Sequence, residues 1–303
     1  MGDESATSSH APRRADVSVV VVTHDALPWI ENCLASVEAY DTVVVDNASS
    51  DDTVAFVRQR FPAVRLLEEE NRGLAAGWNT GIRATSGAYV LMLNADAWAT
   101  GDAVERLTEF AAAHPRAAVV GPRLRYPDGR LQPSVRGFPT PWRLATEYLF
   151  LRKLAPRTRA LNAFYAADFD HARAVEADAV MGACMLVRRA AIGEVGLLDE
   201  DFFLFSEETD WCYRFAQAGW QVLFTPDAEF VHVGGATHGG RMFKENVRGN
   251  LRFLTKHRGL RAAERARRVL LVGCVLRIPR DRGFAEIARW LASGKVPELL
   301  ASP

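Results

Sequence analysis

The chain has 303 residues, of which 49% are hydrophobic, and its 37 basic residues equal its 37 acidic ones. This length and composition suffice for one large domain with a substantial core, or for two modest ones. The zero net charge singles out no class of partner for the chain as a whole. The four cysteines are far apart and form no C-x-x-C pair, which disfavours a disulfide framework or a zinc site and suits a reducing cytoplasm.

Neither end of the chain carries a membrane-spanning pattern. Residues 1–15 are small, polar and partly charged, so they predict a disordered leader rather than a signal peptide. The longest apolar run near the C-terminus, residues 269–276, is far shorter than the roughly 20 residues that span a bilayer. We therefore expect a cytoplasmic protein that is soluble or, at most, peripheral at the inner face of the cell membrane.

Predicted strands and helices alternate from residue 17 to residue 120. Residues 17–22 form a continuous, mostly β-branched run, which is typical of a strand buried on both faces. Further strands are predicted at 42–45, 64–67, 89–93 and 118–120, with helices after Pro28, after residues 49–52, over 74–85 and after Thr100. Repeated βα units of this kind predict a largely parallel, doubly wound α/β sheet.

The second half of the chain is less regular. Residues 122–178 are rich in Pro, Arg and aromatic residues, and the tail from Phe243 onward is helical and basic. The predicted elements are a helix over 141–154, a strand over 180–187, a helix over 207–218, and short strands at 222–224 and 230–233. No internal repeat or clear linker divides the chain.

Polar residues follow three of the predicted strands at the points where those strands end. They are Thr23-His24-Asp25, Asp46-Asn47 and Asn94-Ala95-Asp96. Ligands of open parallel sheets bind in the crevice outside the carboxyl ends of the strands. The sequence therefore predicts a ligand site at this edge of the sheet.

Seven short motifs occur in order between residues 17 and 257. They are the strand ending in Thr23-His24-Asp25; Asp46-Asn47-Ala48-Ser49-Ser50-Asp51-Asp52-Thr53; Asn71-Arg72-Gly73 with Gly77, Asn79 and Gly81; Leu93-Asn94-Ala95-Asp96; Gly182-Ala183-Cys184-Met185-Leu186 with Arg188-Arg189; Gly196, Asp199, Phe203 and Glu207-Glu208-Thr209-Asp210 with Gly219-Trp220; and Pro226 with His232. In this combination the chain resembles the family 2 glycosyltransferases of the GT-A fold, most of all the bacterial rhamnosyltransferases of cell-wall and polysaccharide assembly.

The resemblance implies a Rossmann-like α/β fold with a mostly parallel central sheet flanked by helices. It implies a GT-A domain over residues 16–240, with a nucleotide-binding half over about 16–121 and an acceptor-binding half over about 122–240. A basic helical extension, residues 241–303, would follow this domain.

The resemblance also implies a set of residues that bind the nucleotide sugar. Asp46 would contact the pyrimidine base or its ribose, and Thr23 and Asp25 would form part of the wall. The full set is Thr23, Asp25, Asp46, Asn47, Asn71, Arg72, Asn79, Asn94 and Asp96. Asp46 as a simple helix cap, and Gly77 and Gly81 as positions of close helix–sheet packing, remain the structural alternatives.

Asn94-Ala95-Asp96 stands where the family usually has an Asp-x-Asp metal motif. The resemblance implies a divalent cation, Mn²⁺ or Mg²⁺, held by Asp96 and completed by His232; imidazole favours Mn²⁺. The amide of Asn94 removes one negative charge, so metal affinity should be weaker in the absence of nucleotide. A turn carboxylate and a structural histidine are the alternatives.

The segment Glu207-Glu208-Thr209-Asp210 begins a predicted helix. Acidic residues in a first turn are ordinary partners of the helix dipole, but three carboxylates in four residues repel one another and raise at least one pKa. The resemblance places the base that takes the acceptor's proton at Glu208. Asp210 is the alternative base, or a structural anchor that faces inward.

The resemblance implies an inverting, metal-dependent hexosyltransferase that moves a sugar, rhamnose from dTDP-rhamnose, to a glycan or a lipid-linked acceptor. A UDP-sugar is the main alternative donor. Two other functions are alternatives. A nucleotidyltransferase would need a Gly-rich signature with a basic residue near the N-terminus, which this chain lacks. The second alternative is a catalytically impaired module that binds sugar nucleotides. The loss of the first metal Asp favours the impaired module, and Glu208 disfavours it.

Basic residues outnumber acidic ones between Arg241 and Arg282, and apolar residues lie among them. Solvated helix faces explain such a pattern, and so does an amphipathic contact with anionic lipid. No recognition motif supports nucleic-acid binding. An anionic membrane surface is therefore the one macromolecular partner that this segment predicts.

Overall fold

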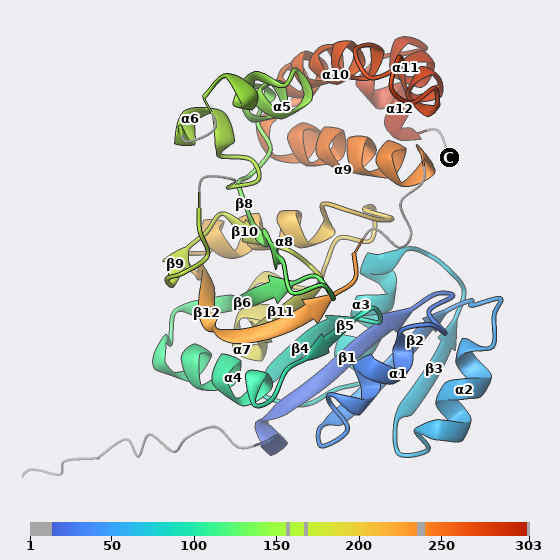
Figure 1. Ribbon diagram of the computed structural model, residues 1–303, viewed down its shortest axis with the longest axis vertical. Coiled ribbons are helices and arrows are strands. Elements are labelled where there is room, and N and C mark those ends of the chain that lie inside the picture. Colours follow the sequence, from blue (N-terminus) through green and yellow to red (C-terminus); the bar gives the residue numbers. More distant parts are fainter. Residues whose placement is uncertain (1–13, 156–157, 167–168, 235–239, 302–303) are drawn as a thin grey trace, which may run out of the picture.

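Figure 1 shows the computed structural model, which describes residues 14–155, 158–166, 169–234 and 240–301. A twisted sheet forms the centre, helices cover both of its faces, and a further layer of helices lies at the top of the view. The predicted leader, residues 1–15, lies outside the described residues except for its last two, which belong to a short 3₁₀ helix over Arg14–Asp16.

The main sheet has ten strands, eight of which follow one another in the order β3-β2-β1-β4-β11-β6-β12-β5. The strands β1 to β4 are mutually parallel, as are β6 and β12, whereas β11 runs antiparallel to β4 and β6. The expected α/β fold with a mostly parallel sheet is confirmed. The strands are β1 (Val17–Thr23), β2 (Asp41–Asn47), β3 (Arg65–Glu69), β4 (Tyr89–Asn94), β5 (Ala97–Ala99), β6 (Ala117–Arg125), β7 (Leu131–Gln132), β8 (Val135–Arg136), β9 (Val175–Glu176), β10 (Ala179–Val180), β11 (Cys184–Arg188) and β12 (Gln221–His232).

The valines of β1 alternate between two cores, one on each face of the sheet. Val19 and Val21 pack with residues of α1, α2 and α4, while Val20 and Val22 pack with residues of α3, α7 and α8. This double burial is what a continuous β-branched run predicts. The helices are α1 (Ile30–Ala35), α2 (Thr53–Arg60), α3 (Leu74–Arg83), α4 (Ala103–Ala113), α5 (Pro141–Tyr148), α6 (Arg159–Asn162), α7 (Arg189–Val195), α8 (Glu207–Gln217), α9 (Gly240–Arg258), α10 (Leu260–Val275), α11 (Gly283–Ala292) and α12 (Val296–Ala301).

Two predicted strand boundaries in the second half are wrong. The run 180–187 is divided, because β10 pairs with β8 in a separate small sheet and only β11 enters the main sheet. The two short strands expected at 222–224 and 230–233 are one strand, β12, in which the register shifts between Thr225 and Glu229. The irregularity accommodates Pro226, which has no amide to donate to the ladder.

Two predicted helix ends also differ. Thr100 does not cap α4: its hydroxyl donates to the carbonyl of Glu229 at 2.8 Å, and Asp102 occupies the cap position. The helix expected over 141–154 ends at Tyr148, because Phe150 adopts a left-handed backbone conformation with a φ of 60°, and a 3₁₀ helix follows over Leu151–Leu154.

The upper layer in Figure 1 consists of α5 and the C-terminal helices α9 to α12. Their buried side chains, among them Leu144, Leu251, Leu270 and Leu291, form a third hydrophobic cluster of their own. The expected helical C-terminal part is therefore confirmed, and it is a packed layer rather than a loose tail. No helix in the described ranges combines the length and the apolarity that crossing a membrane requires.

Two glycines bring α3 close to the sheet. A Cβ atom at Gly77 would lie 2.8 Å from Cγ1 of Val22, and one at Gly81 would overlap Cγ1 of Val20. The helix therefore approaches β1 and β2 more closely than any side chain at these positions allows. This confirms close helix–sheet packing as a role of both glycines.

We predict that Gly81→Ala destabilises the protein by about 1–3 kcal/mol, because the added methyl group overpacks the interface of α3 with β1. Gly193→Ala in α7 is the matched control, since a Cβ there would meet no atom within 4 Å. The control should lose no stability and gain up to about 1 kcal/mol from helix propensity. Urea unfolding measures both, and equal stabilities of the two variants would contradict the packing argument.

Candidate functional site

The carboxyl ends of β1, β2 and β4 lie side by side. Thr23 pairs with Asp46 in the register of β1 and β2, and Val22 pairs with Asn94 in the register of β1 and β4. The structure thus brings the three predicted polar clusters together at one edge of the sheet. This edge is where ligands of such sheets bind.

Two carboxylates hold the loop that follows β2. Asp46 is buried and accepts hydrogen bonds from the amide and the hydroxyl of Ser49, at 3.0 and 2.5 Å. Asp25, whose φ is 52°, accepts the amides of Ser50 at 2.6 Å and Asp51 at 3.2 Å. These backbone hydrogen bonds hold the pKa of Asp25 below its usual range. Hydrogen bonds from within the protein to Asp25 and Asp46 therefore hold this loop.

Thr23 and Asn47 lie beside this loop. The Thr23 hydroxyl is buried and, within the part of the chain that the structure describes, has no hydrogen-bond partner. Asn47 donates from Nδ2 to the carbonyl of Gly73 at 3.2 Å, and Asn71 accepts the amide of Gly73 at 3.1 Å. A buried hydroxyl without a partner costs free energy unless a ligand completes it, which makes Thr23 a group that a ligand at this edge can satisfy.

Arg72 and Asn79 face the loop before α8 rather than the strand ends. Arg72 pairs with Glu200 at 3.1 Å. Asn79 is buried; its Nδ2 donates to the Leu198 carbonyl and to Glu200, both at 2.9 Å, and its Oδ1 accepts the Leu198 amide at 3.0 Å. The amide protons of Asn79 are thus fully used within the protein, so its predicted part in nucleotide binding stays a prediction.

Asp96 and His232 meet where β12 passes the turn after β4. His232 is buried, and its Nε2 lies 3.3 Å from Oδ1 of Asp96, although 136 residues separate the two. On the other side of the ring, Nδ1 donates to Oε1 of Gln132 at 2.9 Å. The contact with Gln132 fixes the orientation of the ring, as a partner on the second ring nitrogen does for metal-binding histidines.

The charge state of Asp96 also suits a cation. Burial raises the pKa of Asp96, but the hydrogen bond and charge of His232 and the amide of Gly234 outweigh it, so the pKa lies below its ordinary value. An ionised carboxylate oxygen and an imidazole nitrogen fit Mn²⁺. Among the described residues no third Asp, Glu, His or Cys joins them in a cluster.

Sequence reasoning missed Gln132. It lies in the two-residue strand β7, 100 residues before the histidine that it orients, in a segment with no regular pattern. No local signal could have found it.

Glu207 and Glu208 begin α8; Glu207 is buried and Glu208 is half-buried. In each, Oε2 is buried and has no hydrogen-bond partner among the described residues. Burial raises the pKa of both groups, and the charge of Glu208 adds to the rise at Glu207. For Glu208, the Arg136 charge and backbone amides reduce the rise without cancelling it. A raised carboxyl pKa is confirmed, with burial rather than repulsion as its main cause.

Two contacts connect Glu208 with the strand ends. A Cβ atom at Gly182 would lie 3.5 Å from Cγ of Glu208, so this carboxylate sits directly over the glycine. The next residue, Ala183, accepts the backbone amide of Asn94 at 3.0 Å. The segment Gly182-Ala183 therefore connects the candidate base with the turn that carries Asp96.

Asp210, the alternative base, is fully buried and occupied. Oδ2 accepts Nε of Arg214 at 2.8 Å, while Oδ1 lies 2.7 Å from Nε2 of His257 and 2.8 Å from Nζ of Lys256. Both oxygens are thus engaged by side chains of the protein, two of which, Lys256 and His257, belong to α9. This geometry favours the structural-anchor interpretation of Asp210 and leaves Glu208 as the candidate base.

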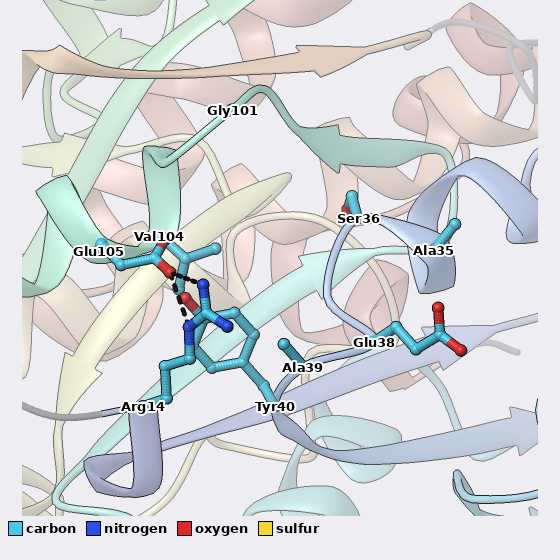
Figure 2. A pocket seen from close by; sticks show the side chains of 9 residues that line it. All are labelled: Arg14, Ala35, Ser36, Glu38, Ala39, Tyr40, Gly101, Val104 and Glu105. Atoms are coloured by element: carbon cyan, nitrogen blue, oxygen red, sulfur yellow. Dashed lines mark hydrogen bonds and ion pairs between the residues drawn. The ribbon is translucent and has the colours of Figure 1, made fainter.

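The cavity drawn in Figure 2 is not part of this site. It has a volume of about 390 Å³ and lies beside Arg14, which precedes β1 and pairs with Glu105 at 2.8 Å. The strand-end residues follow β1, so this cavity lies at the opposite edge of the sheet. None of the predicted site residues lines it.

Two curated relatives are similar to most of the chain. The N-acetylglucosaminyl-diphospho-decaprenol L-rhamnosyltransferase of Mycobacterium tuberculosis is 31% identical over 235 residues, which make up 71% of this chain and 75% of that protein. The low-salt glycan biosynthesis hexosyltransferase Agl10 of Haloferax volcanii is 26% identical over 208 residues, or 66% of this chain and 61% of that protein.

Solved structures share the fold. The mannosyltransferase PcManGT from Pyrobaculum calidifontis, in complex with GDP-Man and Mn²⁺, superimposes with a TM-score of 0.58 at 20% identity, covering 95% of this chain and 79% of that one. GalNAc-T7 with UDP, GalNAc and Mn²⁺ gives a TM-score of 0.55 at 18% identity, covering 78% of this chain and 47% of that one. These likenesses show that the fold is the GT-A fold.

The family model described as glycosyl transferase family 2 matches residues 18–196, which is more than half of the chain. The match covers β1 to α7 and includes the strand-end cluster with Asp96. Together with the rhamnosyltransferase relative, it shows that the chain belongs to the family 2 glycosyltransferases.

Proposed function

We propose that this chain is an inverting glycosyltransferase that moves rhamnose from dTDP-rhamnose to a glycan or lipid-linked acceptor. The observation that carries the proposal is the Asp96–His232 pair at the turn after β4, together with Glu208 beside Gly182 on the segment that bonds to Asn94. The choice of rhamnose rests on the mycobacterial relative, which is named for an L-rhamnosyl donor group and a lipid-diphosphate acceptor. A UDP-sugar is the alternative donor.

In this proposal the strand ends hold the donor. The loop stabilised by Asp25 and Asp46 would support the nucleoside, and the Thr23 hydroxyl would complete its missing hydrogen bond there. The remaining residues assigned to the donor are Asn47, Asn71, Arg72, Asn79 and Asn94. Asp96 and His232 would hold a divalent cation, which when bound neutralises charge on the diphosphate leaving group.

Glu208 would accept the proton of the acceptor hydroxyl as that oxygen attacks the anomeric carbon from the face opposite the nucleotide. Burial suits this role, because a carboxyl with a raised pKa is a stronger base in its ionised form. Gly182 leaves the space beside Glu208 open, since only hydrogen occupies the side-chain position there.

We further propose that the outer face of α10 contacts anionic membrane lipid. Arg261, Arg265 and Arg268 are exposed at helical spacing, and Val272 and Leu276, which are 49% and 48% exposed, follow in the same stripe. A basic face that continues into exposed apolar residues is typical of a helix that lies on lipid. Such contact would bring the enzyme to a lipid-linked acceptor.

We predict that Asp96→Ala abolishes the tightening of dTDP or UDP binding by Mn²⁺, as measured by calorimetry with and without the cation. Gln132→Leu should weaken Mn²⁺ binding by about 10–100-fold, the loss typical when the residue that orients a metal-binding histidine is removed. Asp128→Ala, which removes a carboxylate from an exposed turn, should change nothing. Wild-type turnover of the Asp96 variant in EDTA would contradict the metal assignment.

We predict that Glu208→Gln lowers kcat by roughly 10²–10⁴ while donor affinity is unchanged, because the amide cannot accept a proton. In the wild type, kcat should rise with pH and reach half its maximum above the ordinary pKa of a glutamate, since Glu208 must be ionised to act. Steady-state kinetics over a pH series measures both effects.

Asp210→Asn is the competing variant in that experiment. It should lower the melting temperature, because it weakens the contact between α8 and α9, and spare kcat per folded molecule. If it instead abolishes kcat at full stability while Glu208→Gln stays active, the base is Asp210. If transfer is measured and neither variant changes it, a contaminating enzyme supplies the activity, and the chain is a module that only binds the sugar nucleotide.

We predict that the triple change of Arg261, Arg265 and Arg268 to Glu abolishes co-sedimentation with phosphatidylglycerol vesicles. The wild-type protein should bind these vesicles at low salt and be released at high salt, because ions screen the attraction. Changing Arg58 and Arg60 of α2 and Arg83 of α3 is the charge-matched control, because these arginines are exposed and both helices lie far from α10 in Figure 1. Equal binding of the wild type to neutral phosphatidylcholine vesicles would count against the electrostatic account.

A further inference from the structure

A second cavity, of about 330 Å³, lies where the C-terminal helices meet the loop before α8. Its walls combine residues from α5, α9, α11 and that loop. Five aromatic rings line it: Tyr148, Tyr165, Phe205, Phe243 and Phe284. Its volume is near the lower end of the roughly 300–1,000 Å³ of small-molecule sites, so it suits one compact ligand group.

The rings hold one another in place. Phe243 packs edge to face against Tyr148 and Phe284, with centroids 5.8 and 4.9 Å apart. Perpendicular pairs of this kind are a favourable aromatic arrangement. The cavity wall is therefore preorganised.

The cavity adjoins the segment that carries the base. Phe205 and Ser206 have φ values of 66° and 71°, a left-handed conformation that residues with side chains rarely adopt. A close approach of α9 accompanies this conformation, since a Cβ atom at Gly249 would lie 2.5 Å from the Phe205 carbonyl oxygen.

The cavity is also connected with Glu208 through Arg136. The guanidinium of Arg136 lies 5.0 Å from the ring centroid of Tyr165, which lines the cavity. The charge of the same guanidinium reduces the rise in the pKa of Glu208, so the guanidinium lies between the cavity wall and the candidate base.

Two polar side chains define the chemistry of the cavity. Asn246 accepts hydrogen bonds at Oδ1 from Tyr148 at 3.0 Å and from Asn250 at 3.2 Å, which orients its amide and leaves Nδ2 to donate. Asp281 uses Oδ1 to accept the Gly283 amide at 2.8 Å. The cavity thus presents aromatic faces, an amide donor and a carboxylate acceptor.

The aromatic rings, the Asn246 amide and the Asp281 carboxylate suit the sugar of a lipid-linked acceptor better than its isoprenoid chain or its diphosphate. An isoprenoid chain would cover Asn246 and Asp281 without making hydrogen bonds to them, which is costly. A diphosphate would meet the charge of Asp281, and the residues that line the cavity include no Lys or Arg. A neutral sugar ring has apolar C–H faces for the rings and hydroxyls that both donate and accept.

We propose that this cavity binds the sugar ring of the acceptor and directs one of its hydroxyls to Glu208. The inference rests on the proposed transferase function, and it assigns acceptor recognition to the C-terminal helices. The aromatic rings contact the C–H face of the sugar, Asn246 donates to one hydroxyl, and Asp281 accepts from another.

The test uses the full chain and octyl N-acetylglucosaminide as the acceptor probe. Asp281→Ala should raise its KM by about 10–100-fold, the loss expected when a hydrogen bond to a charged group is removed. Phe284→Ala should also raise the KM, because it removes a ring that contacts the C–H face of the sugar. Donor affinity and the slow hydrolysis of donor without acceptor should stay at the wild-type level. Phe110→Ala is the matched control and should leave KM unchanged, because Phe110 belongs to α4, which lies far from α9 and α11 in Figure 1.

Direct binding separates this inference from the transferase proposal. Saturation-transfer NMR without donor should show contact of free N-acetylglucosamine with the wild type and its loss in both cavity variants. Competition by octanol as strong as that by the glycoside would assign the cavity to the alkyl chain and overturn the inference. An unchanged KM in stable variants would overturn it as well. Absence of any donor binding or hydrolysis would instead contradict the transferase proposal, while the NMR experiment still tests the cavity.

Discussion

The buried carboxylate of Asp210 is the interaction on which the arrangement of the site depends. It is completely enclosed, and it binds Arg214 on its own helix and Lys256 and His257 on α9. Lys256 extends the network to Asp199 at 2.6 Å. An isolated buried charge is strongly unfavourable, so the carboxylate requires α8, α9 and the loop before α8 to pack in one geometry. The position of Glu208, two residues before Asp210 in the same helix, follows from that packing.

Two carboxylates of the site have opposite electrostatic environments. Asp96 faces an imidazole and a backbone amide, which keep its pKa low. Glu208 lies over Gly182, and burial raises its pKa although the charge of Arg136 opposes the rise. Divergent environments of this kind give two carboxylates two roles. The low pKa at Asp96 suits a permanent charge beside a diphosphate, and the raised pKa at Glu208 suits proton transfer.

The C-terminal helices contact the base segment on one side and present an exposed face on the other. The inner side of α9 binds Asp210 and closes against Phe205 through Gly249, while its first turns line the aromatic cavity. The outer side of the layer presents the basic and apolar stripe of α10. One packed layer thereby supports the base, encloses the proposed acceptor pocket and carries the proposed lipid contact.

The sequence by itself determined the parts of this protein that depend on local pattern. The β-branched run of β1 predicted burial on both faces, and the ordered motifs predicted the GT-A fold and the polar row of Thr23, Asp46 and Asn94 at the strand ends. These features follow from the alternation of side chains along a strand and from parallel strands ending at one edge. The pairing of Asp96 with His232 was expected only through the family resemblance, since no spacing rule links residues that far apart.

The tertiary structure alone decided the contacts between distant segments. Gln132 orients His232, and Asn79 accepts a hydrogen bond from the amide of Leu198. Asp210 contacts Lys256 and His257, which lie 46 and 47 residues further along the chain. The tertiary structure also decided the division of β10 from β11 and the formation of the aromatic cavity. Each depends on which surfaces meet when helices and sheet pack, and that outcome is set by the summed shape and burial of many side chains rather than by the pattern of any one segment.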